Sequence, residues 1–391
     1  MSGDQFLPQY EPQAALLADY RRRGSQGKSA VLPDDWPQSI KSPMAWTAED
    51  LQSHHVFQLT ESEVQETMNW GCAYSGSGQG IDRVDKESAV LPQLQEKLAQ
   101  IRQSLHDGPG LAVLRGLDPT GVSMKENLVI FAGVSSHISP RRAAQSGGKI
   151  ITCPRPTEIP AWWVVGIISH IDTSVKLTQL HQPFHTDPAA DVVAMYVLEP
   201  GMDGGNGIFS SVQTIYNRLA ASDPGLLREL GQPNWPFDRP LDNQGEYCRR
   251  QIMFFGKSGE PEMMFSRGAL IRSPYGSRPP GISDLTRVQS MALDALHFTA
   301  TSTMCTLRYQ KGDMIFFNNR CILHGREGFS NGLGTTHAKR HILRLWLRNE
   351  EMSGPPPAPL IESWEHALKR AGIGGENVID KPDVTVDPCK L

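Results

Sequence analysis

The chain has 391 residues, of which 39% are hydrophobic and 20% charged, so it is long enough to bury a substantial core and does not belong to the disordered class. Its formal net charge of −4 provides no basic surplus that would attract nucleic acid or an anionic membrane surface. No apolar run approaches the roughly 20 residues that span a bilayer. We therefore expect a globular protein with neither a nucleic-acid nor a membrane partner.

The cysteines and the two ends of the chain suggest a location. The 6 cysteines include no Cys-x-x-Cys pair, which argues against a zinc ribbon or a thioredoxin-type motif and favours reduced intracellular thiols. The first five residues lack the charged-then-apolar order of a signal peptide, so we expect a cytoplasmic protein. The terminal Cys389-Lys390-Leu391 resembles a peroxisomal Ser-Lys-Leu-type signal, which makes the peroxisome the alternative.

In chain order, the first third predicts an arm, two helices and a strand. Residues 1–45 are polar and proline-rich, as in an arm that wraps a protein surface. Thr60-Glu61-Ser62-Glu63 has the form of a capping box and predicts a helix that ends near Cys72. Apolar residues at helical spacing predict a helix over 90–106, and the apolar run 111–114 predicts a buried strand.

The middle third combines an irregular segment with a strand and two helices. Residues 145–185 show little periodicity but contain several aromatics and histidines, a composition typical of active-site covers. Val192–Leu198 is apolar throughout and predicts a strand that is buried on both faces. Apolar spacing predicts a helix over 212–219, and Asp223-Pro224 marks the start of another.

The last third predicts two helices and three strands. Ser283 is the expected cap of a helix that extends to about Leu296. Three β-like segments follow, at 305–309, 314–317 and 341–347. A closing helix is expected over 360–368. Short scattered strands with helices around them are typical of a β-sandwich.

Two His-x-Asp pairs are candidates for metal binding, although such a pair is weak evidence by itself. His185 and Asp187 come just before the strand predicted at 192–198, and residues two apart on an extended segment point to the same side. His170 and Asp172 lie within the irregular segment and lack that support. The pair at 185 and 187 is therefore the better candidate.

The third ligand is expected from a distant strand. Gly312-Asp313 opens a hydrophobic strand, and His324 follows its polar end. The set His185, Asp187 and His324 would leave three adjacent positions open on an octahedral ion, an arrangement suited to non-haem Fe(II). A core histidine bonded to backbone is the alternative for His324.

The segment 340–348 alternates as a strand does. One face carries Arg340, Ile342, Arg344 and Trp346, and the other carries His341, Leu343, Leu345 and Leu347. If the leucine face packs on helices, Arg340 and Arg344 point inward, roughly 13 Å apart at about 3.3 Å per residue. Buried arginines need anions. Solvent-facing positions, or pairing with a protein carboxylate such as Asp313 or Glu327, are the alternatives.

Together these motifs resemble the TauD/TfdA family of Fe(II)- and 2-oxoglutarate-dependent dioxygenases, in a fungal-type subgroup. In family order they are Phe184-His185-Thr186-Asp187, Gly204-Gly205 before a helix with Tyr216-Asn217, Gly312-Asp313, Leu323-His324-Gly325-Arg326 and the segment 340–347. The resemblance covers about residues 100–370. It implies a mixed α and β fold with a double-stranded β-helix, or jelly-roll, core, flanking helices and an inserted helical and loop segment.

The resemblance also implies a division of the chain. Residues 1–90 would be an N-terminal arm and helices that pack on the core. Residues 91–372 would be the jelly-roll dioxygenase domain, with the insertion at about 205–300, and residues 373–391 a C-terminal tail. A homo-oligomer is compatible with the sequence.

Roles for individual residues follow from the same resemblance. His185, Asp187 and His324 would be the catalytic iron ligands, with 2-oxoglutarate and O2 as co-substrates. Arg340 would bind the distal carboxylate of 2-oxoglutarate, and Arg344 an acidic group of the substrate. Side chains close to the ligand pair in sequence are candidates for substrate contact or for packing: Trp162, Trp163, His181 and Phe184.

One position departs from the family pattern. The family usually has Thr or Ser shortly after the Gly-Gly pair, and its hydroxyl binds the same distal carboxylate. This chain has Gly207 there. Either Ser210 or Ser211 supplies the hydroxyl, or the co-substrate is held more weakly.

The implied function is oxidation of an unactivated C–H bond, by hydroxylation, desaturation or ring closure, in a small carboxylate or amino-acid-like substrate, with secondary metabolism as one setting. A cupin-like hydrolase or isomerase with zinc or manganese is an alternative, but it has no need for the inward arginines. A non-catalytic jelly-roll binding module has no need for the His/Asp/His set. Oxygen consumption and succinate release separate the three.

Overall fold

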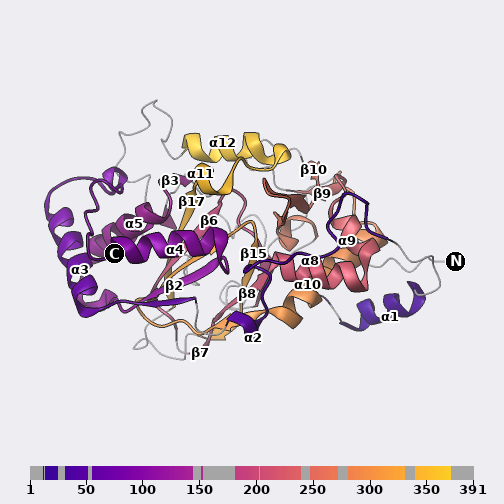
Figure 1. The fold of residues 1–391 in the computed structure, drawn as a ribbon, viewed down its shortest axis with the longest axis horizontal. Coiled ribbons are helices and arrows are strands. Elements are labelled where there is room, and N and C mark those ends of the chain that lie inside the picture. The colour runs from indigo at the N-terminus through magenta and orange to yellow at the C-terminus, as the bar shows by residue number, and fades with distance from the viewer. Residues whose placement is uncertain are drawn as a thin grey trace, which may run out of the picture.

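The computed structural model describes residues 12, 14–24, 31–51, 55–143, 151–152, 181–201, 203–238, 247–271, 281–330 and 340–370. These residues form layers: one group of helices, a seven-stranded sheet, a four-stranded sheet and a second group of helices (Figure 1). The predicted mixed α and β class is confirmed. Within these ranges no helix has the length and apolarity that a bilayer crossing requires.

The seven-stranded sheet contains most of the strands that the sequence predicted. Its order is β1 (Val56–Gln58), β2 (Leu111–Arg115), β14 (Met314–Asn318), β6 (Val192–Glu199), β17 (His341–Arg348) and β3 (Arg141–Ala143), with β4 (Ile151–Thr152) also beside β17. β1 and β2 are parallel, and the other pairs are antiparallel. The strands predicted from apolar runs are therefore the buried ones of this sheet.

The four-stranded sheet carries the two candidate histidine ligands, His185 and His324. Its order is β13 (Cys305–Leu307), β8 (Gly207–Ser211), β15 (Ile322–Arg326) and β5 (Gln182–His185), and all neighbours are antiparallel. Its inner side chains meet those of the larger sheet in one buried cluster, where the Phe209 and Phe317 rings are 5.3 Å apart. Only β13 was predictable as a strand, because glycine, serine and histidine interrupt the apolar pattern of the other three.

Helices α3 (Glu61–Gly76), α4 (Gln95–Asp107) and α5 (Met124–Ile138) lie on the outer side of the seven-stranded sheet (Figure 1). Leu343 and Leu345 of β17 belong to the cluster beneath these helices, whereas Ile342 and Trp346 belong to the cluster between the sheets. The alternation predicted for 340–348 is therefore confirmed. The capping box predicted at Thr60 is also present. No pattern indicated α5, because it is buried nearly all round and lacks an amphipathic period.

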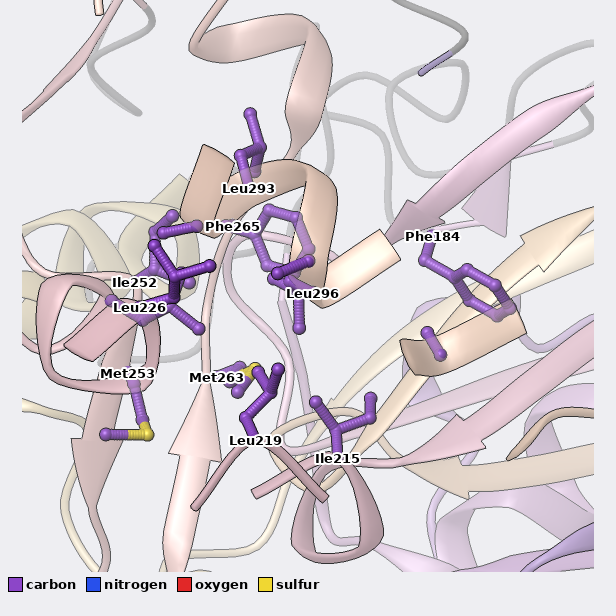
Figure 2. Close-up of a cluster of buried hydrophobic side chains, with 14 of the residues drawn as sticks. Phe184, Ile215, Leu219, Leu226, Ile252, Met253, Met263, Phe265, Leu293 and Leu296 are labelled. Carbon is purple, nitrogen blue, oxygen red and sulfur yellow. The ribbon is translucent and has the colours of Figure 1, made fainter. Parts of the chain in front are cut away.

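Helices α8 (Val212–Ser222), α9 (Pro224–Leu230) and α10 (Arg287–Thr303) cover the outer side of the four-stranded sheet. Their apolar residues form the cluster drawn in Figure 2, to which Ile208 and Leu323 of the sheet also belong. Leu17 of α1 (Ala14–Gly24) packs into the same cluster. The helices predicted over 212–219 and from Pro224 are confirmed.

The start of α10 corrects the sequence prediction. The helix begins at Arg287 with Thr286 as its N-cap, not with Ser283. The Gln289 amide donates to Thr286 Oγ1 at 3.2 Å, and the Thr286 amide donates to Gln289 Oε1 at 3.0 Å. Ser283 instead accepts a hydrogen bond from Arg249 at 3.0 Å. The reciprocal capping box at Thr286 satisfies two donors, which a lone serine three residues earlier does not.

We expect Thr286→Ala to lower the free energy of unfolding by about 1 kcal/mol, because the Gln289 amide in the first turn of α10 loses its acceptor, Thr286 Oγ1. Ser283→Ala, the matched control, should change it by less than about 0.5 kcal/mol. Urea unfolding followed by circular dichroism measures both values. Equal losses in the two variants would mean that Ser283 stabilises the helix start after all.

The remaining elements are short. β7 (Asp203–Gly204) pairs with β16 (Phe329–Ser330), β9 (Trp235–Phe237) with β10 (Cys248–Arg250), and β11 (Met253–Phe255) with β12 (Pro261–Met263). Single turns are α2 (Ala48–Leu51), α11 (Glu350–Ser353) and the 3-10 turns η1 (Ile81–Arg83), η2 (Pro119–Gly121), η4 (Arg267–Ala269) and η5 (Ala358–Leu360). The predicted closing helix is α12 (Ile361–Arg370), which buries Trp364 and Leu368.

Candidate active site

Two strands of the four-stranded sheet bring the predicted ligands together. His185 ends β5 and is paired in register with His324 of β15, and Asp187 follows β5 by two residues. Their ligand atoms all lie within 4.8 Å of one another. The three residues are only 9%, 4% and 7% exposed for His185, Asp187 and His324. Within the described ranges this is the one group of three or more such residues that can hold a metal ion.

The protonation and the hydrogen bonds of the two imidazoles suit the binding of a metal cation. His185 Nδ1 lies 3.0 Å from the Pro183 carbonyl oxygen, which makes Nδ1 the protonated nitrogen and leaves Nε2 for a metal. His324 Nδ1 is buried and has no hydrogen-bond partner among the described residues. Burial lowers the pKa of His185 and holds that of His324 well below its usual range, so both rings are neutral. Two neutral buried imidazoles, one with an unsatisfied nitrogen (His324) and one whose Nε2 has only the Gln182 side-chain amide 3.3 Å away (His185), fit a metal site.

Asp187 is held in its ionised form by hydrogen bonds and a neighbouring charge. Trp346 Nε1 donates to its Oδ2 at 2.7 Å, and Asn319 accepts from its amide and donates to its carbonyl, each at 2.8 Å. Burial raises the pKa of Asp187, but the charge of Arg344, the two neighbouring imidazoles and the Trp346 hydrogen bond together lower it overall. The sequence did not single out Asn319 or Trp346 for the site, although Trp346 shares the inward strand face with Arg344.

We expect Trp346→Phe to weaken Fe(II) binding by roughly 10- to 100-fold, because Asp187 loses the indole donor that orients it. Anaerobic titration with Fe(II) measures the affinity. Trp364→Phe is the matched control, since the Trp364 ring packs against Arg348 rather than against a ligand. An unchanged affinity in Trp346→Phe would show that Asp187 is oriented without the indole.

Arg344 forms an ion pair within the site. Its Nη1 lies 3.2 Å from Asp187 in an ion pair, and its side chain is 26% exposed. The two carboxylates named as alternatives are engaged elsewhere: Asp313 accepts from Arg115 at 2.8 Å, and Glu327 accepts from Asn206 at 2.8 Å. Of the alternatives for Arg344, the structure contains the pairing with a protein carboxylate, but the partner is Asp187 rather than Asp313 or Glu327. Substrate contact by Arg344 stays a prediction.

Arg340 lies at the start of β17, against the Gly-Gly motif. It is 6% exposed, and its Nη2 donates to the Gly205 carbonyl oxygen at 3.3 Å. Gly205 has a φ of +72°, and a β-carbon there would come within 3.0 Å of Arg340 Nε. Glycine is therefore needed for the turn and for the close approach of the guanidinium. Burial lowers the pKa of Arg340, against a smaller opposing effect of Tyr309.

The other predicted substrate residues have different positions. Phe184 is buried in the cluster with α8 and α10 (Figure 2), on the opposite face of β5 from His185. Its ring lies 6.0 Å from that of His297. Adjacent strand residues point to opposite faces, so Phe184 has a packing position that does not support substrate contact. His181 is half-buried just before β5. Four of the residues that the sequence analysis named lie outside the described ranges: Trp162, Trp163, His170 and Asp172.

Comparisons with known proteins show the family of this chain. The family described as "Taurine catabolism dioxygenase TauD, TfdA family" matches residues 77–346. The "Taurine hydroxylase-like protein SAT17" of Stachybotrys chartarum is 27% identical over 328 residues, which is 82% of this chain and 83% of that protein. The "FR-33289 synthase" of Streptomyces rubellomurinus is 26% identical over 317 residues, or 80% of this chain and 90% of the relative.

Solved structures share the fold. An asparagine oxygenase bound to Fe(II), 3-hydroxyasparagine and succinate superposes with a TM-score of 0.57 at 16% identity, covering 75% of this chain and 93% of that one. The non-haem iron oxygenase OrfP, bound to Fe, succinate and dihydroxy-arginine, superposes with a TM-score of 0.51 at the same identity and coverage. The family match spans most of the chain and includes all three ligand candidates. The chain therefore belongs to the TauD/TfdA family and is an Fe(II)- and 2-oxoglutarate-dependent dioxygenase.

Proposed function

We propose that His185, Asp187 and His324 hold the Fe(II) of this dioxygenase. The observation that carries the proposal is the buried set of two imidazoles and one carboxylate, with ligand atoms within 4.8 Å of one another. Such a set leaves adjacent positions of an octahedral ion open for co-substrates. We further propose that Arg340 binds the distal carboxylate of 2-oxoglutarate. Bound Fe(II), with 2-oxoglutarate and O2, supplies the oxidation of an unactivated C–H bond and releases succinate and CO2.

The chain's own residues contribute geometry and burial. Pro183 selects the tautomer of His185, and Trp346 and Asn319 orient Asp187. The apolar cluster between the two sheets adjoins the candidate ligands: the ring of Phe317, which belongs to it, lies 4.6 Å from that of His324. Low exposure excludes bulk water from the reacting groups.

A double-stranded β-helix is the proposed core. The chain alternates between the sheets, from β5 to β6, on to β8 and β13, and then through β14, β15 and β17. The inner faces of both sheets share one apolar cluster. Alternation of this kind between two facing antiparallel sheets supports a jelly roll.

A small amino-acid-like or other carboxylate is the proposed substrate, with hydroxylation, desaturation or ring closure as the outcome and the cytoplasm as the location. The solved neighbours hold asparagine- and arginine-derived products, and the curated relatives are named for a taurine hydroxylase and for a synthase. Arg344 is the proposed partner of the substrate's acidic group, since its side chain is partly exposed beside Asp187.

The test is a substrate screen on the Fe(II)-loaded enzyme with 2-oxoglutarate and O2. Amino acids, sulfonates, aryloxy acids and betaines are offered singly, and O2 uptake, succinate and oxidised product are measured together. We expect one class to accelerate O2 uptake and to yield a product heavier by one oxygen or lighter by two hydrogens. Turnover of the same compounds without O2, on zinc- or manganese-loaded protein, would instead establish a hydrolase or isomerase.

Arg344→Ala should uncouple the reaction once a substrate is found. We expect succinate to form slowly with little oxidised product, because the target C–H bond is no longer held close to the oxidant. The ratio of product to succinate measures the effect. A ratio equal to that of the unaltered enzyme would show that Arg344 only balances the charge of Asp187.

A further inference from the structure

The space beside Gly207 is filled by another residue. Gly207 of β8 is paired with Leu307 of β13, and Tyr309 lies two residues beyond Leu307. A β-carbon built on Gly207 would overlap the Tyr309 hydroxyl and come within 2.7 Å of Tyr309 Cζ. The phenol oxygen therefore occupies the place that the side chain of residue 207 would take.

The phenol lies among positive charges. Arg340 Cζ is 5.9 Å from the Tyr309 ring, and both Arg340 and Arg326 act electrostatically on the hydroxyl. Arg326 is paired in register with Gly207. Both arginines also lie close to the Phe329 ring: the distance to its centroid is 4.5 Å from Arg326 Cζ and 5.4 Å from Arg340 Cζ. Two guanidinium groups and one phenol thus gather around Gly207 and Phe329, a donor set suited to an anion.

The Tyr309 hydroxyl is a free donor at this place. Tyr309 is only 8% exposed, yet its hydroxyl makes no hydrogen bond to any residue in the described part of the chain. Burial raises the pKa of the phenol to about 12, although the two arginines oppose this, so the hydroxyl keeps its proton. The phenol is largely buried, and a hydroxyl without a protein partner at such a position is available to a bound ligand.

This donor set lies at a suitable distance from the metal ligands. On β8, Phe209 is opposite His324 and Gly207 is opposite Arg326. Gly207 is therefore two residues along the strand from the ligand pair, roughly 7 Å at about 3.4 Å per residue, and on the same face. A five-carbon dicarboxylate anchored on the metal at one end reaches this position with the other.

The serines named from the sequence are not available for this role. Ser210 Oγ lies 3.0 Å from Thr303 Oγ1, on the side of the sheet that faces α10. Ser211 Oγ donates to the Met44 carbonyl oxygen at 2.5 Å and caps α8 by accepting from the Thr214 amide at 3.1 Å. The expectation that either serine replaces the missing hydroxyl is therefore corrected.

We propose that the Tyr309 hydroxyl donates a hydrogen bond to the distal carboxylate of 2-oxoglutarate beside Arg340, and that Gly207 is glycine because the phenol needs its space. The inference rests on the proposed function, and it adds a co-substrate residue that lies two residues after β13 rather than shortly after the Gly-Gly pair.

The test measures binding rather than turnover. Fe(II)-loaded enzyme is titrated anaerobically with 2-oxoglutarate and, separately, with 2-oxopentanoate, which has the same chain length but no distal carboxylate. We expect Tyr309→Phe to weaken 2-oxoglutarate binding by about tenfold, the loss of one hydrogen bond to a charged group. Binding of 2-oxopentanoate should change by less than about twofold, because its chain offers the phenol no partner.

Two further variants complete the design. Gly207→Ala should reproduce the selective loss, since its methyl group displaces the phenol oxygen. Tyr196→Phe is the matched control, because Tyr196 is buried on the helix-covered face of β6 and bonds Asn127 at 3.1 Å. Thermal unfolding checks that each variant is folded.

The outcomes separate this inference from the proposed function. Equal losses for both ligands in Tyr309→Phe, or no loss for either, would overturn the role of Tyr309. If the unaltered enzyme binds 2-oxoglutarate and Arg340→Lys weakens binding while Tyr309→Phe does not, only the Tyr309 assignment fails. If the unaltered enzyme does not bind 2-oxoglutarate, both the Tyr309 assignment and the proposed function fail.

Discussion

Replacement of His324 by alanine is expected to abolish turnover, with a loss well beyond the roughly 10- to 100-fold that follows removal of a residue that only orients a ligand. His324 supplies one of three buried ligand atoms, and no other described His, Cys, Asp or Glu joins that group. The fold should persist, because both sheets have cores of their own. Bound iron per chain and succinate release measure the effect, and His185→Ala and Asp187→Ala should behave alike.

His341→Ala is the matched control for this prediction. His341 is buried at the start of β17, on a strand adjacent to the site, but it does not belong to the ligand group. It should keep iron and most of the activity. If His324→Ala retained iron and His341→Ala lost it, the third ligand would be His341 rather than His324. Loss of iron on replacing His170 or Asp172 would instead move the whole ligand pair.

The second large effect is expected from Arg340→Lys, which should raise the dissociation constant for 2-oxoglutarate on the order of 100-fold. The guanidinium can bind a carboxylate through two parallel hydrogen bonds, and lysine cannot reproduce that geometry. Arg340 is also confined by Gly205 and by the ring of Phe329, so a shorter cation cannot be repositioned easily. Anaerobic titration of the Fe(II)-loaded enzyme measures the constant.

Arg344→Lys is the comparison for Arg340. Arg344 pairs with Asp187 at 3.2 Å, so this change should affect substrate coupling and leave 2-oxoglutarate binding within about twofold. The reverse result, weak 2-oxoglutarate binding in Arg344→Lys and normal binding in Arg340→Lys, would exchange the two roles.

Local patterns in the sequence were sufficient for much of this protein. The capping box at Thr60 and the apolar run over Val192–Leu198 predicted a helix and a strand that the structure contains, because both depend on neighbouring residues alone. Alternation along 340–348 also predicted correctly which face of β17 packs under helices. The three ligand candidates could be named because a His-x-Asp pair and a distant histidine stand beside predicted strands.

Local sequence patterns did not predict contacts between residues that are far apart in the sequence. The partner of Arg344 is Asp187, 157 residues away, and no spacing rule indicates that pairing. Ser283 was predicted to cap a helix, but the cap is Thr286, and the Ser283 hydroxyl accepts a hydrogen bond from Arg249, which is distant in sequence. Phe184 stood next to a ligand in the sequence but faces the opposite core, because β5 is a strand and adjacent side chains diverge.

The sequence by itself determined the family, the ligand candidates and the identity of the buried strands, since these follow from residue types and their local period. Only the tertiary structure decided how charges are balanced and how space is filled. Gly207 shows the difference most clearly: the sequence shows only that residue 207 has no side chain, whereas in the fold the Tyr309 phenol, from the segment after β13, fills that space. Packing brings together residues that are distant in the chain, and no local pattern contains that information.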